Sequence, residues 1–184
     1  MMQIDSLTKL SKFIALVLRH KPEEIGLTLD GAGWANVVDL LSAMNEHGTP
    51  ISAEQLRAIV GTDEKQRYQF SADFGRIRAS QGHSIEIDLG YQPLEPPELL
   101  YHGTASRFVS SIKKTGLRKG KRHHVHLSIS QGVATGVGKR YGRPVILTVA
   151  AAQMCRDGHA FYRSENNVWL TDHVPVQYIS FPLD

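Results

Sequence analysis

Apolar residues recur near the start of the chain at helical spacing, three or four positions apart: Leu7, Leu10, Ile14 and Val17. This periodicity predicts an amphipathic helix that begins at Ser6, a typical N-cap residue, and ends before Pro22. We place the end there because proline disfavours the helical state in the residue before it.

Two further helices are predicted in the first half of the chain. Asn36 precedes the apolar residues of one, and Ser52 with Gln55 forms a capping box at the start of the other. Before them, we expect a short strand at residues 27–29 and a turn at residues 30–33, where the sequence is DGAG.

A β-hairpin is predicted after the third helix. Residues 67–70 and 76–79 alternate between apolar and polar positions, and the turn sequence SADFG lies between them. Helix, helix, helix, hairpin is the element order of a winged-helix-like module, so we expect such a lobe in residues 1–90.

A proline-rich stretch separates the two halves of the chain. Residues 91–97 (YQPLEPP) contain three prolines, which fit neither a helix nor a central strand. We therefore expect a linker at residues 91–98 and a second lobe at residues 99–184.

The second lobe is predicted to mix strands with helices. Apolar runs predict strands at residues 99–101, 125–127, 145–149, 167–170 and 176–181. Helical spacing predicts helices at residues 106–114 and 131–140, and Gly116 ends the first of these. The whole chain is therefore expected to be an α+β protein.

Composition excludes several classes of protein. Of 184 residues, 41% are hydrophobic and 21% are charged, which is typical of a folded globular chain. The longest apolar stretch, residues 145–152, is far shorter than the roughly 18 residues of a membrane span. The only cysteine, Cys155, cannot form an intrachain disulfide, and the first residues lack the apolar segment of a signal peptide. We expect a cytoplasmic monomer that does not bind membranes.

Charge is distributed unevenly along the chain. Residues 1–90 carry 9 Lys and Arg against 12 Asp and Glu, a net charge of −3. Residues 91–184 carry 12 against 6, a net charge of +6, and the two halves add to the +3 of the whole chain. This asymmetry indicates an anionic partner for the second lobe, or a solvated basic face without a partner.

Basic residues gather in two motifs of the first lobe. Arg19, His20 and Lys21 lie at the end of the first predicted helix, where cations also stabilise the helix dipole. Arg76 and Arg78 project from the same face of a predicted strand. Two guanidinium groups so placed can hold a phosphate, or they can line an exposed sheet.

Two motifs of the second lobe contain histidine. His102-Gly103-Thr104 follows an apolar strand, and glycine there lets a ligand approach the backbone closely. His124 and His126 share a strand face, but no cysteine and no suitably spaced carboxylate completes a zinc site. The basic residues around them favour phosphate as the ligand, and we expect no metal.

Several common enzyme motifs are absent from the sequence. It contains no P-loop, no GxGxxG, no nucleophile elbow and no HExxH. An enzyme with so few acidic residues in its second half would rely on cationic electrostatics rather than on paired carboxylates.

Short motifs occur in a specific order along nearly the whole chain: LSKF (10–13), LRHKP (18–22), IRASQGHS (77–84), LYHGTAS (100–106), HVHLS (124–128), GKR (138–140) and ENNVWLT (165–171). Together they resemble the RNA 2′-phosphotransferase family, called KptA in bacteria. The resemblance implies a winged-helix-like lobe that binds RNA and a lobe with the ADP-ribosyltransferase fold that binds NAD+.

The reaction that the resemblance implies removes an internal 2′-phosphate from RNA, of the kind left at tRNA splice junctions. The 2′-phosphate attacks C1″ of the NAD+ ribose and expels nicotinamide, which leaves ADP-ribosylated RNA. The ribose 2″-hydroxyl then attacks phosphorus. RNA with a free 2′-hydroxyl and ADP-ribose 1″,2″-cyclic phosphate are released.

The resemblance also implies roles for individual residues. Arg19, His20 and Arg78 are expected to bind the RNA 2′-phosphate, and Arg140 to stabilise the transition state of the second step. An acid or base role for His20 stays open, and Arg76 is a secondary candidate. The residues expected to contact NAD+ are His102, Gly103, Thr104, His126, Ser128 and Asn166.

Two positions near the end of the chain bear on the substrate. Val168 stands where many protein-modifying relatives of the fold carry Glu, which fits a nucleic-acid substrate. Asn167 stands where members of the family carry Gly, and Asn tolerates the positive φ that such a position favours.

Two other functions share parts of this pattern. An ADP-ribosyltransferase that acts on nucleic-acid ends or terminal phosphates would use the same fold and NAD+, and would leave ADP-ribose on its product. A winged-helix DNA-binding regulator that senses NAD+ would need a basic first lobe, whereas residues 1–90 carry a net charge of −3.

Overall fold

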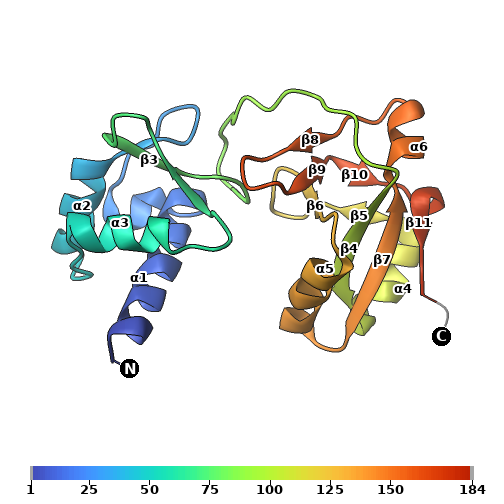
Figure 1. The fold of residues 1–184 in the computed structure, drawn as a ribbon, viewed down its shortest axis with the longest axis horizontal. Coiled ribbons are helices and arrows are strands. Elements are labelled where there is room, and N and C mark those ends of the chain that lie inside the picture. Colours follow the sequence, from blue (N-terminus) through green and yellow to red (C-terminus); the bar gives the residue numbers. More distant parts are fainter. Residues whose placement is uncertain (1, 183–184) are drawn as a thin grey trace. The chain divides into compact units, whose positions relative to one another are not determined.

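Two hydrophobic cores form in the computed structural model, which describes residues 2–182. One core lies in the unit that ends at Gly90, and the other lies in the unit that begins at Tyr91 (Figure 1). Helices and strands occur in both units, so the chain is an α+β protein. Within the described residues, no helix is long and apolar enough to cross a membrane.

The first helix, α1 (Met2–Arg19), starts earlier than its sequence predicts. Ser6 lies inside the helix rather than at its N-cap, because residues 2–5 contain no glycine or proline that would stop it from extending. The other end agrees with the prediction: α1 stops at Arg19, and Pro22 begins a short 3-10 helix, η1 (Pro22–Ile25). The apolar stripe of α1 is fully buried at Ile14, Val17 and Leu18.

The caps predicted for the next two helices are confirmed. α2 (Val37–Glu46) begins after Asn36, whose side-chain oxygen accepts the backbone N–H of Val38 at 2.8 Å. α3 (Ala53–Gly61) begins with the reciprocal hydrogen bonds of a capping box between Ser52 and Gln55.

A three-stranded antiparallel sheet completes the first unit, in the order β1-β3-β2. β2 (Tyr68–Phe70) and β3 (Arg76–Ala79) form the predicted hairpin, whereas the two-residue β1 (Ala35–Asn36) was not predicted. The strand predicted at residues 27–29 does not form. Leu27 instead donates its backbone N–H to the carbonyl of Pro22, which ties this segment to η1.

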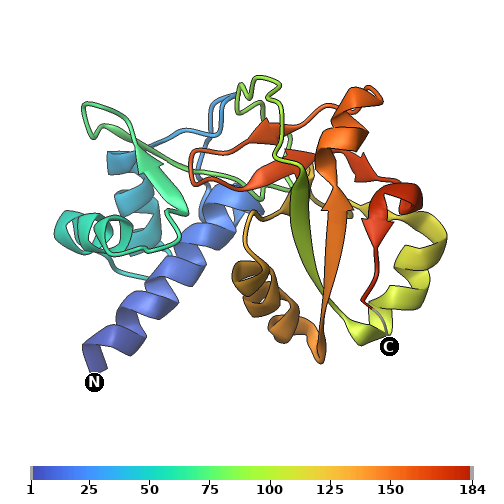
Figure 2. The ribbon, with the colours of Figure 1, turned by 45° about the vertical axis from the view of Figure 1, so that its right-hand side comes forward.

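In the part of the second unit that the structure describes, the strands form two three-stranded antiparallel sheets and one strand pair. Figure 2 draws these strands as arrows. The first sheet has the order β11-β7-β4, with bounds Ile179–Ser180, Pro144–Ala150 and Leu99–Ala105. The second has the order β6-β9-β8, with bounds Val125–Leu127, Trp169–Thr171 and Tyr162–Arg163. The pair consists of β5 (Leu117–Arg118) and β10 (His173–Val174).

The α-helices that the structure describes in the second unit are α4 (Ser106–Thr115), α5 (Gln131–Gly138) and α6 (Ala151–Arg156). Gly116 caps the end of α4 as predicted. α5 is shorter than predicted, because the chain tightens at its end into the 3-10 helix η2 (Lys139–Tyr141), which carries Arg140.

Two predicted strands near the C-terminus have different bounds. β9 begins at Trp169 rather than at residue 167, because Asn167 adopts a left-handed turn conformation that a strand does not accommodate. Residues 176–181 are split: the 3-10 helix η3 (Val176–Tyr178) comes first, closed by a hydrogen bond from the N–H of Tyr178 to the carbonyl of Pro175. Only Ile179–Ser180 are extended.

Gly103 lies inside β4 rather than after it, at the point where α5 packs on the strand. A Cβ atom at Gly103 would stand 1.7 Å from the carbonyl oxygen of Ala134. Gly138 makes the reciprocal approach, since its Cβ would stand 2.6 Å from the carbonyl of Thr104. The close approach that the sequence assigned to a ligand is therefore made by the backbone of α5.

We expect Gly103→Ala to lower the free energy of unfolding by about 2–3 kcal/mol, because α5 must move to admit a methyl group. Gly136→Ala is the matched control: outside the backbone of α5 itself, nothing lies within 4 Å of its Cβ position, so it should stabilise α5 by about 0.5–1 kcal/mol. Urea unfolding followed by circular dichroism measures both. Equal effects of the two substitutions would contradict the packing role of Gly103.

Candidate functional site

The end of α1 and the segment Ser80–Ser84 lie together in the first unit. The N–H of Ser84 donates to the carbonyl of Arg19 at 2.9 Å, and Nδ1 of His20 lies 2.9 Å from Oγ of Ser84. Gly82, with φ of +87°, places its Cβ position 3.9 Å from an Nη atom of Arg19. The structure thus brings Arg19 and His20 to the loop that follows Arg78.

The guanidinium of Arg19 is held by a backbone carbonyl. Its Nη2 donates to the carbonyl oxygen of Arg67 at 3.2 Å, and the same oxygen accepts the backbone N–H of Ser80 at 2.8 Å. A carbonyl fixes a guanidinium without neutralising its charge. This contact therefore orients the Arg19 side chain.

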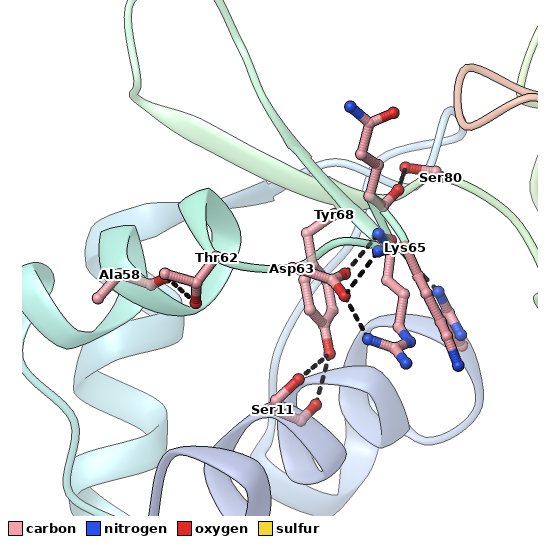
Figure 3. Close-up of polar contacts among 10 residues, drawn as sticks. Ser11, Ala58, Thr62, Asp63, Lys65, Tyr68 and Ser80 are labelled. Carbon is pink, nitrogen blue, oxygen red and sulfur yellow. Dashed lines mark hydrogen bonds and ion pairs between the residues drawn. The ribbon is translucent and has the colours of Figure 1, made fainter. Parts of the chain in front are cut away.

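Asp63 holds the turn that carries this carbonyl (Figure 3). Its carboxylate accepts the backbone N–H groups of Arg67 at 2.6 Å and Lys65 at 3.3 Å, and it forms an ion pair with the Arg67 guanidinium. The Asp63 side chain is only 5% exposed. On the other side of the turn, the hydroxyl of Ser80 donates to the carbonyl of Gln66 at 2.8 Å.

Tyr68 ties the same hairpin to α1. Its hydroxyl lies 2.5 Å from the carbonyl oxygen of Ser11, to which it donates (Figure 3). Burial raises the pKa of Tyr68 above its usual value, so this hydroxyl keeps its proton at neutral pH. The hairpin and the helix that carries Arg19 are thus joined by a permanent hydrogen-bond donor.

Arg78 and Arg76 differ in the groups that hold them. The guanidinium of Arg78 stacks over Trp34, 4.5 Å from the ring centroid, and donates from Nε and Nη2 to Oε1 of Gln69 at 3.3 and 3.2 Å. Arg76 lies farther from the same ring, 5.4 Å from its centroid, and pairs with the carboxylate of Asp30 at 3.4 Å. In the described part of the chain no acidic side chain pairs with Arg78, so it is the stronger candidate for binding a phosphate.

His102 and His126 lie on neighbouring strands of the second unit. Tyr101 of β4 and Ser128, the residue after β6, are joined by two backbone hydrogen bonds of 2.8 Å. Nδ1 of His102 lies 3.0 Å from the carbonyl oxygen of His126. Since a carbonyl only accepts, Nδ1 carries the proton, and Nε2 of the neutral ring is left as an acceptor.

Both imidazoles are neutral at physiological pH. Burial lowers the pKa of His102, and the nearby positive charge of Arg122 acts in the same direction. Burial, followed by Arg122, lowers the pKa of His126 to about 3. This pair therefore offers neutral hydrogen-bonding groups rather than positive charge.

The other residues expected at an NAD+ site lie in or next to these strands, or in the turn between β8 and β9. Thr104 is buried in β4, and the hydroxyl of Ser128 accepts the N–H of Ser130 at 3.0 Å. Asn166 lies in the turn between β8 and β9, where its side-chain oxygen accepts from the hydroxyl of Ser164 at 2.7 Å. Asn167 has φ of +60°, the positive value expected at this position.

Arg140 lies in η2, directly after α5, and is exposed. Across residues 2–182, no carboxylate forms an ion pair with it. The structure places it in the second unit, whereas Arg19, His20 and Arg78 belong to the first.

Among the described residues there is no group of three histidine, cysteine, aspartate or glutamate side chains that could hold a metal ion. His124 lies just before β6, with its ring centroid 5.4 Å from that of Tyr162. Its aromatic neighbour gives it a packing role.

Comparison with known proteins assigns the chain to a family. Residues 5–173 match the model of a family described as "RNA 2′-phosphotransferase, Tpt1 / KptA family". The chain belongs to this family.

Relatives span almost the same length. A protein of Agrobacterium fabrum named "Probable RNA 2′-phosphotransferase" is 52% identical over 177 residues, which cover 96% of this chain and 95% of that protein. Proteins with the same name from Flavobacterium johnsoniae and Pseudomonas aeruginosa are 52% and 49% identical. These alignments cover 94% of both chains in the first case, and 97% of this chain and 98% of the relative in the second.

Three residues that orient arginines in this Tpt1/KptA chain were not found from the sequence: Trp34, Asp63 and Gln69. Trp34 precedes a strand too short to predict, and Gln69 acts across the hairpin. The Asp63 motif, DEKQR, does contain an acid four residues before an arginine, but that spacing is also common on helix surfaces.

We expect Asp63→Ala to destabilise the first unit by about 2–3 kcal/mol, because two backbone N–H groups and the Arg67 guanidinium lose their buried acceptor. Asp73→Ala is the control. Asp73 also accepts a backbone N–H, from Gly75 at 3.0 Å, but it is exposed, so its loss should be much smaller. Urea unfolding compares the two variants, and similar losses would contradict the importance of the Asp63 turn.

The two neutral histidines predict acid sensitivity. Because the pKa of His126 in the folded protein lies near 3, the unfolded chain binds more protons than the folded chain between about pH 6.5 and pH 3. The free energy of unfolding therefore decreases as the pH is lowered across that window. Between pH 7 and pH 5 the loss from His126 is about 2 kcal/mol.

The measurement is urea unfolding at both pH values, with His126→Gln as the comparison. Asp73 and Asp172, whose pKa values are lowered by hydrogen bonds from Ser71 and Lys119 respectively, stay ionised across this range. The variant should show a flatter pH dependence; an unchanged slope would contradict the assignment.

Proposed function

We propose that the protein is an NAD+-dependent RNA 2′-phosphotransferase, which removes an internal 2′-phosphate from RNA and releases nicotinamide and ADP-ribose 1″,2″-cyclic phosphate. The observation that carries the proposal is the match to the RNA 2′-phosphotransferase family over residues 5–173. We propose RNA of the tRNA splice-junction type as substrate, and a monomer acting in the cytoplasm.

In this proposal the two units have different tasks. The first, with three helices and a three-stranded antiparallel sheet, would be the winged-helix-like lobe that binds RNA. The second, with its mixed helices and strands, would be the ADP-ribosyltransferase-fold lobe that binds NAD+.

Arg19, His20 and Arg78 would bind the 2′-phosphate. Arg19 is oriented by a backbone carbonyl, and Arg78 by an amide and an indole, so both guanidinium groups are positioned to form charge-assisted hydrogen bonds to phosphate oxygens. His20 is exposed beside Ser84, where its imidazole can donate to the same group. Such positioning is what a displacement at a ribose carbon requires, since the leaving group is already cationic.

NAD+, when bound, supplies the electrophilic ribose carbon and the nicotinamide leaving group. The neutral imidazoles of His102 and His126 fit its ribose hydroxyl and amino groups, because Nε2 of His102 is an acceptor. Thr104, Ser128 and Asn166 would add hydroxyl and amide groups. Gly103 would contribute through its backbone alone, since α5 fills the space beside it.

Arg140 would act in the second step, in which the ribose 2″-hydroxyl attacks phosphorus. Negative charge on the equatorial phosphoryl oxygens then needs a cation, and Arg140 has no carboxylate partner among residues 2–182. Val168 fits this division of labour, because a valine cannot serve as an acid or base and leaves charge stabilisation to the arginines.

The test is a product assay with an oligonucleotide that bears one internal 2′-phosphate, incubated with and without NAD+. We expect NAD+-dependent conversion to the 2′-hydroxyl oligonucleotide, with ADP-ribose 1″,2″-cyclic phosphate as the nucleotide product. An intact 2′-phosphate after long incubation with folded protein would overturn the proposal. ADP-ribose found on nucleic-acid ends would then favour the end-modifying ADP-ribosyltransferase.

Arg140→Ala should separate the two steps. Loss of one charge-stabilising group typically slows a step by about 100-fold or more, so ADP-ribosylated RNA should accumulate. Arg143→Ala removes a neighbouring exposed arginine and is the matched control, with no accumulation expected. Mass spectrometry of the RNA distinguishes the intermediate from substrate and product. Equal accumulation in both variants would remove the assignment of Arg140.

A further inference from the structure

The strand register places three side chains in one row across the sheet of the first unit. Ala35 pairs with Ile77 and Asn36 with Arg76 in the antiparallel ladder, so Trp34 comes opposite Arg78. On the other side of β3, Gln69 pairs directly with Arg78. The row is therefore Trp34, Arg78 and Gln69.

This row lies on the face of the sheet that turns away from the core. Ala35 and Ile77, which alternate with it, are fully buried in the first hydrophobic core. Trp34, Arg78 and Gln69 are each partly exposed. A ligand can therefore reach the row while the opposite face of the sheet stays packed.

The guanidinium of Arg78 is held along one edge and one face. Its Nε and Nη2 atoms both donate to Oε1 of Gln69, which occupies the Nε edge. The indole of Trp34 lies against the planar face, 4.5 Å from Cζ to the ring centroid. The terminal edge, formed by Nη1 and Nη2, is the edge from which a guanidinium can donate two parallel hydrogen bonds to a phosphate.

Asp30 supports this arrangement from the turn before β1. Its Oδ1 accepts the N–H of Trp34 at 2.9 Å, which fixes the backbone of the stacking residue. Its Oδ2 pairs with Arg76 at 3.4 Å. One carboxylate thus anchors Trp34 and compensates Arg76, while Arg78 is held only by neutral groups.

We propose that Trp34 and Gln69 are positioning residues for Arg78, and that they set the preference of the protein for a 2′-phosphorylated over a 2′-hydroxyl nucleotide. The inference rests on the proposed function, in which Arg78 binds the 2′-phosphate. An arginine side chain that is fixed before binding loses less conformational entropy when the phosphate arrives.

The experiment compares two oligonucleotides that differ only in one internal 2′-phosphate. Fluorescence anisotropy gives the dissociation constant of each, without NAD+, for the full-length protein. The ratio of the two constants is the phosphate preference. This ratio isolates the phosphate contact, because a merely structural change in the lobe weakens both oligonucleotides alike.

Trp34→Leu removes the aromatic face, and we expect it to lower the phosphate preference about tenfold, a typical effect for a partly desolvated cation–π contact. Trp34→Phe keeps an aromatic ring and should retain most of the preference. Gln69→Leu, on a different strand, should also lower it. Phe74→Leu changes an exposed aromatic residue of the same hairpin and should leave the ratio unchanged. Circular dichroism establishes that each variant is folded.

A double-mutant cycle with Arg78→Ala shows whether the effect runs through Arg78. In that background, Trp34→Leu should cause no further loss of preference, because the group that it positions is gone. An equal loss in both backgrounds would overturn the inference, and so would a Trp34→Leu variant that keeps the wild-type ratio.

The same data distinguish failure of the proposed function. A wild-type ratio near one would mean that the protein does not recognise the 2′-phosphate, which overturns the proposed function and the inference with it. A clear wild-type preference that Arg78→Ala abolishes and Trp34→Leu retains would overturn the inference alone.

Discussion

Neutral partners orient a cation without adding a competing negative charge, which is the property required of the arginines proposed here to bind phosphate. Arg19 donates to a carbonyl, and Arg78 donates to an amide and stacks on an indole. Other cations pair with carboxylates: Arg67 with Asp63, Arg76 with Asp30 and Lys119 with Asp172. These acids stabilise turns and sheet edges, whereas no carboxylate among residues 2–182 forms an ion pair with Arg78 or Arg140.

Local signals in the sequence were sufficient for the elements that depend on neighbouring residues. The caps at Asn36 and Ser52 and the hairpin at residues 67–79 are formed by side chains and turns a few positions apart, so they could be predicted. β1 depends on pairing with β3, some forty positions further along the chain. Its two residues carry no periodicity of their own, so it could not be found.

The same distinction applies to the candidate site. Arg19, His20 and Arg78 could be named as candidates, because the short motifs that contain them resemble those of the family. The groups that orient these side chains could not be named from the sequence. They are Trp34, Gln69 and the carbonyl of Arg67, whose roles depend on strand register and turn geometry. For Gly103, the sequence shows the absence of a side chain but not the reason for it. The reason is the close approach of the α5 backbone, which leaves no room for a Cβ atom.

The contact between α5 and β4 has a mechanical consequence. Gly103 and Gly138 leave no side chain between the two backbones, and Gly138 leads directly into the 3-10 helix that carries Arg140. A shift of the strand that carries His102 and Thr104 therefore also moves α5 and the 3-10 helix with Arg140, because no side chain between the two backbones can absorb the movement. Within the second unit, β4, α5 and the 3-10 helix with Arg140 move together as one rigid group.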